Sequence, residues 1–126
     1  MMLADTADPL HERARKTRDD WLAQGGFLVT TDYVADETFT LLRVRLGHDE
    51  AVAWWEQIEG SSRLLWEWIE PARFDRAREW YFKWRDQRFS FTDCTSFVVM
   101  REKRLSAALT SDRHFAAAGF TMVPAA

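Results

Sequence analysis

Short apolar segments alternate with longer helical patterns along this sequence, and the alternation constrains the fold more than any other feature. Runs rich in apolar or β-branched residues have the length of strands, at residues 27–30, 64–69, 107–110 and 121–123. Patterns typical of helices lie around them, at residues 9–24, 32–46, 49–59, 71–86, 92–103 and 112–118. Such an order indicates a parallel sheet with helices on both faces. We therefore expect one α/β domain over residues 1–126, with three layers (α/β/α) and a mostly parallel central sheet.

Composition narrows the class of protein. Apolar residues make up 47% of the 126 residues and charged residues 29%, which is typical of a globular protein. No apolar run approaches the roughly 20 residues of a membrane helix, and we expect neither a membrane anchor nor a secretory signal. The single cysteine, Cys94, excludes an internal disulfide and favours the cytoplasm. The net charge of −3 argues against nonspecific nucleic-acid binding, but is compatible with an enzyme that gathers acids around a cation.

Three acidic residues fall where a parallel sheet of this kind places its functional groups. Asp112 follows the third predicted strand, Asp93 opens the helix before that strand, and Glu37 lies in the second turn of the helix after the first strand. Ligands of such sheets gather at the carboxyl ends of the strands. Each acid alone has a simpler explanation: Asp93 as a first-turn acid, Asp112 as an N-cap and Glu37 as a solvated side chain. Together they predict a site for Mg²⁺ or Mn²⁺.

The C-terminal third resembles a known family. Residues 89–120 read FSFTDCTSFVVMREKRLSAALTSDRHFAAAGF, similar to the corresponding part of PIN-domain ribonuclease toxins, the VapC-like components of bacterial type II toxin–antitoxin systems. The upstream segments TTDYVADETFTLLR and LADTADPLHERA are similar to two further segments of that family. The resemblance covers almost the whole chain. It implies a PIN-like fold and a metal-dependent endoribonuclease that hydrolyses RNA phosphodiester bonds.

The resemblance also assigns residues. Glu37, Asp93 and Asp112 match three acids of the family's metal site, which uses Mg²⁺ or Mn²⁺. Arg113 and His114 stand beside Asp112 and are expected to contact the RNA phosphate. The three histidines of the chain show no zinc-binding spacing and are predicted at the surface. Cys94 is predicted to be a small buried residue and not a nucleophile.

The start of the chain departs from the family pattern. The family's first strand normally ends in an aspartate, whereas only four residues precede Asp5 here, fewer than a usual strand. We therefore expect the central strand to be missing and the metal site to lack one carboxylate, with Asp5 as the remaining candidate for it. This favours an alternative hypothesis, a catalytically impaired PIN-fold protein that only binds an antitoxin or itself. A third hypothesis is a small binding domain whose acids are only helix caps.

Tryptophan is abundant, with seven residues in 126. Aromatic side chains are favoured both in cores and at interfaces with partners. In the resembled family, the helices that correspond to residues 32–60 receive the C-terminal segment of the antitoxin. The expected partners are thus a cognate antitoxin, an RNA substrate and a second copy of the chain in a homodimer.

Overall fold

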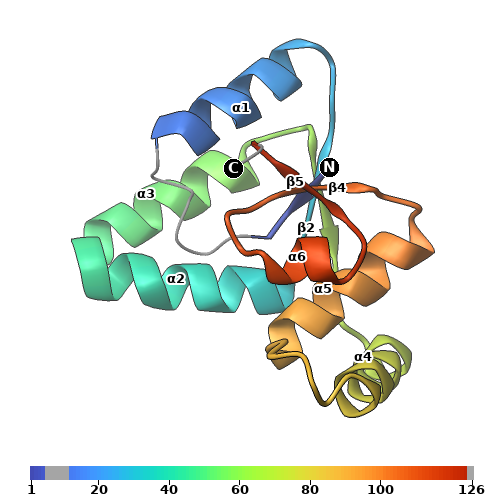
Figure 1. Ribbon diagram of the computed structural model, residues 1–126. Helices are drawn as coiled ribbons and strands as arrows, with labels where there is room; N and C mark the ends of the chain where they lie inside the picture. The colour runs from blue at the N-terminus through green and yellow to red at the C-terminus, as the bar shows by residue number, and fades with distance from the viewer. Residues whose placement is uncertain (5–11, 125–126) are drawn as a thin grey trace.

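The computed structural model describes residues 1–4 and 12–124 and has three layers, with a sheet between two groups of helices (Figure 1). The sheet has five strands in the order β3-β2-β1-β4-β5, and every neighbouring pair is parallel. The strands are β1 (Met2–Leu3), β2 (Leu28–Thr31), β3 (Leu64–Glu67), β4 (Ala107–Leu109) and β5 (Thr121–Val123). The helices are α1 (Glu12–Ala23), α2 (Asp32–Leu46), α3 (His48–Glu59), α4 (Pro71–Lys83), α5 (Phe91–Glu102) and α6 (His114–Ala117). The predicted three-layer α/β/α fold is confirmed.

Two hydrophobic clusters separate the faces of the sheet. In β1, Met2 belongs to a cluster built largely from α5, and Leu3 belongs to a cluster built with α1, α2 and α3. Adjacent residues of β2 and β4 divide between the same two clusters. Because successive side chains of a strand point to opposite faces, a sheet covered on both sides needs apolar residues at consecutive positions. The short, continuous apolar runs of this sequence follow from that requirement.

The expectation that the central strand would be missing is wrong. β1 is only two residues long, yet it lies in the middle of the sheet and pairs with β2 on one side and β4 on the other. Met2 is fully buried. Further hydrogen bonds extend this pairing, because the Ala4 amide donates to the Leu109 carbonyl and the Thr30 hydroxyl donates to the Leu3 carbonyl. Pairing on both sides and burial on both faces hold a strand that is too short to be detected from its own sequence.

The helices around the sheet begin where side chains can cap them. The Thr31 hydroxyl accepts a hydrogen bond from the Val34 amide at the start of α2, and Ser90 caps α5 in the same way. Helix α2 ends before Gly47, which has a φ of 102°, a conformation that favours glycine. None of the helices in the described parts of the chain is long and apolar enough to cross a membrane.

The tryptophans near β3 form a path of aromatic contacts from the core to the surface. Trp54 is buried on α3 and meets the ring of Phe39 edge-on. Phe39 also contacts Trp55, Trp55 contacts Trp66, and Trp66 stacks on Trp68 with ring centroids 6.3 Å apart. Trp68, at the end of this path, is 64% exposed. As expected, the tryptophans therefore divide between the core and the surface.

Candidate active site

Asp93 enters the site from the first turn of α5, where it also helps to cap the helix. Its backbone amide donates to the Ser90 hydroxyl at 2.9 Å, and its Oδ2 accepts from the Ser90 amide at 3.1 Å. This reciprocal pair is a capping box. The interpretation of Asp93 as a structural acid of the first turn is therefore correct, but it accounts for only one of its two carboxylate oxygens. The side chain is 13% exposed.

Asp112 enters from the turn that follows β4. Its amide donates to the hydroxyl of Thr110 at 3.0 Å, and its Oδ1 accepts from the His114 amide at 2.9 Å, at the start of α6. A short side chain that accepts from the amide two residues ahead fixes the turn. The hypothesis that Asp112 caps the short helix is thus close to what the structure shows. Again only one carboxylate oxygen is used.

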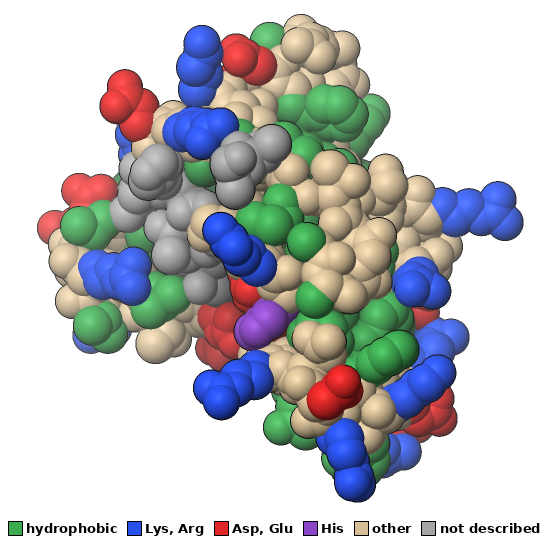
Figure 2. Space-filling view, viewed as in Figure 1, with side chains coloured by type: hydrophobic (Ala, Val, Ile, Leu, Met, Phe, Trp, Pro, Cys, Tyr) green, Lys and Arg blue, Asp and Glu red, His purple; other side chains and the backbone are tan. Residues whose placement is uncertain are grey.

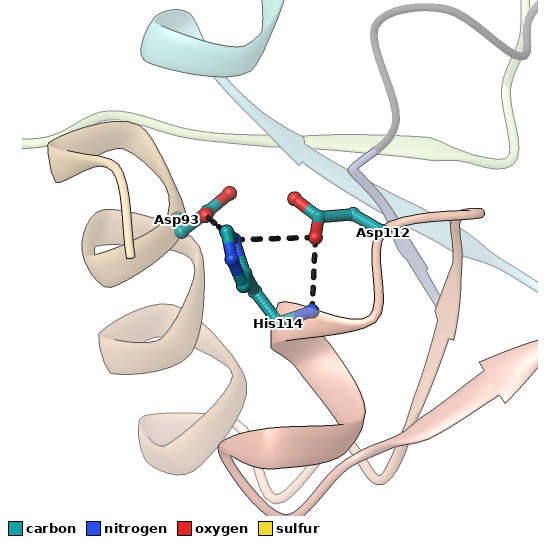
Figure 3. Close-up of side chains that lie close together, drawn as sticks. All are labelled: Asp93, Asp112 and His114. Atoms are coloured by element: carbon teal, nitrogen blue, oxygen red, sulfur yellow. Dashed lines mark hydrogen bonds and ion pairs between the residues drawn. The ribbon is translucent and has the colours of Figure 1, made fainter. Parts of the chain in front are cut away.

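His114 joins the two aspartates (Figure 3). Its Nδ1 lies 3.1 Å from Oδ2 of Asp93 and 3.3 Å from Oδ1 of Asp112. In the described residues, these three side chains form the one group whose candidate ligand atoms all lie within 4.8 Å of one another. The ring of Phe89 meets the imidazole edge-on, with centroids 5.7 Å apart. The site is therefore assembled from α5, the turn after β4 and α6.

The position of this group agrees with the topology of the sheet. The chain runs outward from β1 through β2 to β3 on one side, and β4 and β5 lie on the other. The strand order therefore reverses at β1, and parallel sheets bind ligands outside the carboxyl ends of the strands at such a point. Asp112 lies just past the carboxyl end of β4, the strand next to β1.

Burial and charge both disfavour ionisation of Asp93. Burial is the larger cause of the raised pKa of Asp93, and the negative charge of Asp112 adds to it. The Ser90 amide and His114 oppose the rise, because both favour the ionised form. A fold that buries Asp93 beside a second carboxylate in this way destabilises the charged form of Asp93, and a cation between the two groups would relieve the repulsion.

The geometry fits a divalent cation. The hydrogen bonds described above use Oδ2 of Asp93 and Oδ1 of Asp112, and Figure 3 shows the other two oxygens directed toward the same space. Carboxylate oxygens are the ligands that Mg²⁺ and Mn²⁺ prefer. In each aspartate, one carboxylate oxygen thus accepts hydrogen bonds that stabilise the fold, and the other oxygen is directed into the site.

The other predicted site residues lie outside this group. Glu37 is half-buried in the second turn of α2 and is not among the three residues whose ligand atoms cluster. Asp5 lies outside the described residues. Arg113 is exposed beside Asp112. Cys94 is fully buried, as predicted, and burial, followed by the charge of Asp93, raises its pKa to about 12, which disfavours the thiolate.

Sequence reasoning missed the contact between His114 and the two acids. The histidine was expected at the surface with the RNA, whereas its side chain is only 36% exposed and bridges the carboxylates. The sequence did contain a signal, the spacing of Asp112 and His114. The carboxylate of an aspartate can accept a hydrogen bond from the backbone amide two residues later, and this bond keeps the side chain of that residue, here the imidazole, close to the carboxylate. The contact with Asp93 requires α5 and α6 to pack together, and no local pattern predicts that packing.

Comparison with known proteins supports the same interpretation of the fold. Comparison with models of protein families finds no match. FitAcB from Neisseria gonorrhoeae has a similar structure, with a TM-score of 0.57 over 97% of this chain and 96% of that chain; at 19% identity, this shows the fold alone.

A second relative is similar in both sequence and structure. The 23S rRNA-specific endonuclease VapC20 of Mycobacterium tuberculosis is 35% identical over 121 residues, which are 96% of this chain and 89% of VapC20. The crystal structure of VapC20, a sarcin–ricin loop cleaving toxin, has a TM-score of 0.82 at 32% identity and covers 96% of this chain and 97% of that chain. The chain belongs to the VapC family of PIN-domain toxins.

Proposed function

We propose that this protein is a metal-dependent endoribonuclease toxin of a type II toxin–antitoxin system, with Asp93 and Asp112 at its catalytic centre. One observation carries the proposal: a chain of this family holds two carboxylates close together beside the reversal of its strand order, and there the pKa of Asp93 is raised. Helix capping alone does not require the two carboxylates to meet. The hypothesis of a binding domain with purely structural acids leaves that convergence unexplained.

Asp93 and Asp112 would hold the cation through the oxygens that the fold leaves available. Glu37, which lies on α2, and Asp5 complete the proposed set of acids. The chemistry that a bound divalent cation would supply here is neutralisation of charge on the phosphate and activation of a water for attack. The protein's own contribution is to orient the carboxylates, through the Ser90 amide on Asp93 and the His114 amide on Asp112.

His114 bears on which metal the site prefers. Its Nδ1 faces the same carboxylates, and imidazole nitrogen is a ligand that Mn²⁺ accepts more readily than Mg²⁺. We therefore expect tighter binding of Mn²⁺. Calorimetric titration of the wild-type chain and of His114→Ala with each ion tests this: the substitution should weaken Mn²⁺ binding more than Mg²⁺ binding. Equal losses for the two ions would assign the imidazole a purely positional role.

The substrate follows from the relative and from the charges beside the site. VapC20, which is 35% identical, acts on 23S rRNA, and we propose the sarcin–ricin loop of 23S rRNA as the substrate here. Arg113 is exposed next to Asp112, and His114 is partly exposed, so both are placed to contact a phosphate. A ribosomal target implies that the protein acts in the cytoplasm.

Cleavage assays test the proposal directly. Purified 23S rRNA should be cut in the presence of Mn²⁺ or Mg²⁺ and left intact in EDTA. Asp93→Asn and Asp112→Asn should each abolish cutting. Full activity of either variant, or undiminished cutting in EDTA, would contradict the proposal. A wild-type chain that binds an antitoxin but never cuts RNA would instead support the catalytically impaired alternative.

Glu37 needs a separate test because the structure does not bring it into the group. Its neighbour Asp36 is exposed on the same helix and supplies a matched control. Glu37→Gln should reduce cleavage by at least about tenfold, as expected for loss of a group that acts on the reacting site, whereas Asp36→Asn should cleave normally. Equal activity of the two variants would remove Glu37 from the site.

The partners are a cognate antitoxin and a second copy of the chain. The exposed end of the tryptophan path is the best candidate for the antitoxin contact, because exposed aromatic residues are favoured anchors at interfaces. Trp68→Ala should weaken binding of the co-expressed antitoxin in calorimetry without affecting RNA cleavage. Unchanged antitoxin affinity would mean that the antitoxin binds at another surface. Sedimentation of the free protein is a separate test, and it would show whether the chain dimerises.

A further inference from the structure

Aromatic and basic side chains alternate over the end of α4 and over the connector to α5 (residues 84–90), and the proposed function does not yet use them. Residues 81–89 read YFKWRDQRF. Every one of these residues except Phe89 is exposed, and Phe82 is 68% exposed. Exposed aromatic rings at this density need an explanation, because single apolar side chains are normal at a surface but clusters are not. We call the following residues the basic aromatic surface: Tyr81, Phe82, Lys83, Trp84, Arg85 and Arg88.

The positive charges of this surface are available to a ligand. In the first part of α4, Arg73 and Arg76 pair with Glu102, and Arg78 pairs with Asp75. In contrast, no ion pair within residues 1–4 and 12–124 involves the three basic residues of the basic aromatic surface. Asp86 is the one acid among residues 81–89, so the segment is positive within a chain whose net charge is −3. The charge distribution therefore favours a polyanion at this position.

The surface is hollowed in two places that share residues of the connector. One cavity of about 720 Å³ is lined by this segment alone, including Tyr81, Trp84, Arg88 and Phe89. A second cavity of about 700 Å³ lies between α4, α5 and the end of α6, and Trp84 and Phe89 line it as well. Rings and cationic groups around an open depression provide what unpaired bases and phosphates need, namely stacking faces and counter-charges.

Phe89 and Ser90 connect this surface to the proposed catalytic centre. Phe89 lines both cavities and packs edge-on against the imidazole of His114, 5.7 Å away. The next residue, Ser90, donates its amide to the carboxylate of Asp93. Figure 2 shows a histidine side chain, in purple, at the surface, with Lys or Arg and hydrophobic side chains interleaved over the region of α4 below it. A strand of RNA on the basic aromatic surface would therefore continue into the site.

We propose that the basic aromatic surface binds the unpaired nucleotides that flank the cleaved bond, with the rings stacking on bases and Lys83, Arg85 and Arg88 contacting phosphates. The inference rests on the proposed ribonuclease function and adds a recognition surface to it. RNA fits better than a protein partner because unpaired charges at a protein interface would lose their hydration without compensation. Phosphates supply that compensation, and loop bases, unlike paired ones, offer free faces to aromatic side chains.

Binding measurements in an inactive background separate recognition from cleavage. Every variant would carry Asp93→Asn, and the probe would be a fluorescently labelled RNA hairpin with the sarcin–ricin loop sequence. Replacing Phe82 and Trp84 by alanine should raise Kd about tenfold or more, since stacking on each base is lost. This double variant should also lose the preference for the hairpin over a fully paired RNA of equal length.

The charged residues have a different signature. Replacing Lys83, Arg85 and Arg88 together by glutamine should weaken binding and reduce the slope of log Kd against log salt by about 2, as expected for three contacts with single-stranded phosphates. Replacing the exposed Arg43 and Arg45 of α2 by glutamine removes a similar charge elsewhere and should change Kd less than about threefold, since these residues lie outside the surface.

Two results would overturn the inference. One is an unchanged Kd in both sets of variants. The other is a variant that loses RNA binding and also shows, in sedimentation of the free protein, a different molecular mass from the parent protein. That result would identify this surface as a contact between two copies of the chain. Because the variants are compared in the Asp93→Asn background, an absence of cleavage by the wild-type chain would refute the proposed function without affecting this test.

Discussion

Two half-buried carboxylates, Glu67 at the end of β3 and Asp93 in the first turn of α5, have opposite electrostatic surroundings. Glu67 closes β3 and is held by Arg73 at 3.0 Å and by Lys103. Burial alone would raise the pKa of Glu67, but hydrogen bonds and charges from Lys103 and Arg73 lower it. At Asp93, burial raises the pKa and the nearest acid, Asp112, raises it further. One acid is neutralised by basic neighbours, and the other is crowded by an acidic one.

The difference in charge compensation suggests a criterion for separating acids that stabilise this fold from acids that serve the proposed site. The ion pairs of Glu67, Arg73, Glu102 and Lys103 tie the end of β3 to α4 and α5, and they compensate their charges internally. Within residues 1–4 and 12–124, the group around Asp93 pairs with one basic side chain, that of His114, which is charged only when protonated. An uncompensated pair of acids beside the reversal of the strand order indicates a position reserved for a cation.

Neutralising each acid in turn should give the largest contrast. Asp93→Asn should lower the rate of RNA cleavage by at least about 100-fold, because in the proposed mechanism this carboxylate holds the metal beside the reacting groups. Glu67→Gln should retain cleavage within a few-fold at a temperature where both proteins are folded. Rates on 23S rRNA, with circular dichroism to verify folding, measure the contrast. A comparable loss of activity in the two variants would abolish the distinction.

Metal binding should depend on Asp93 and should not depend on Glu67. An ion present at 100 times its Kd stabilises the folded state by about 2.7 kcal/mol. Mn²⁺ should therefore raise the melting temperature of the wild-type chain and of Glu67→Gln, but not that of the double variant with Asp93→Asn and Asp112→Asn. Scanning calorimetry with and without EDTA provides the measurement, and stabilisation of the double variant would place the ion elsewhere.

The free energy of unfolding in EDTA should, in contrast, depend on Glu67. Glu67→Gln should cost about 1–2 kcal/mol, because it weakens charge-assisted hydrogen bonds of a largely buried group. Arg78→Gln removes an exposed pair with Asp75 and should change stability by less than about 0.5 kcal/mol. Urea unfolding quantifies both. A larger loss in Arg78→Gln than in Glu67→Gln would mean that the network around Glu67 contributes little.

The dependence of the free energy of unfolding on pH should give the smallest effect, but the one that distinguishes Asp93 from Glu67 most specifically. In EDTA near pH 7, ionised Asp93 costs stability because its pKa is raised above the ordinary 3.8, so Asp93→Asn should be the more stable protein. That advantage should disappear as the pH falls through the raised pKa. The pKa of Glu67 is lowered from 4.5, so the stability that it contributes should persist at pH 4.5 and be lost only further down. Unfolding at a series of pH values distinguishes the two.

Much of the fold was accessible from the sequence because its boundaries carry strong signals. Helix α2 has the predicted bounds, since Thr31 caps its start and Gly47 ends it. The predicted convergence of Asp93 and Asp112 followed from the rule that parallel sheets gather groups at the carboxyl ends of their strands. The predicted end of α4 was three residues too late, because the chain turns at Trp84, which has a ψ of 59°, without glycine or proline to mark it.

The features that were missed depend on contacts distant in sequence. β1 exists because β2 and β4 flank it, and two residues carry too little pattern to reveal a strand. The place of His114 depends on how α6 packs beside α5. Pairing of Arg73 with Glu102 likewise joins residues from two helices. In each case, local propensity is compatible with several outcomes, and tertiary packing decides between them.

The central position of β1 also has a consequence for the order of folding. The first strand of the chain pairs with the fourth, Leu3 with Leu109, so the middle of the sheet closes a loop of nearly the whole chain. Contacts of such sequence separation form late, because the entropy of closing the loop opposes them. During synthesis, β1 must wait until β4 has left the ribosome. Asp112 lies in the turn that follows β4, so the proposed catalytic centre cannot assemble before the sheet is able to close.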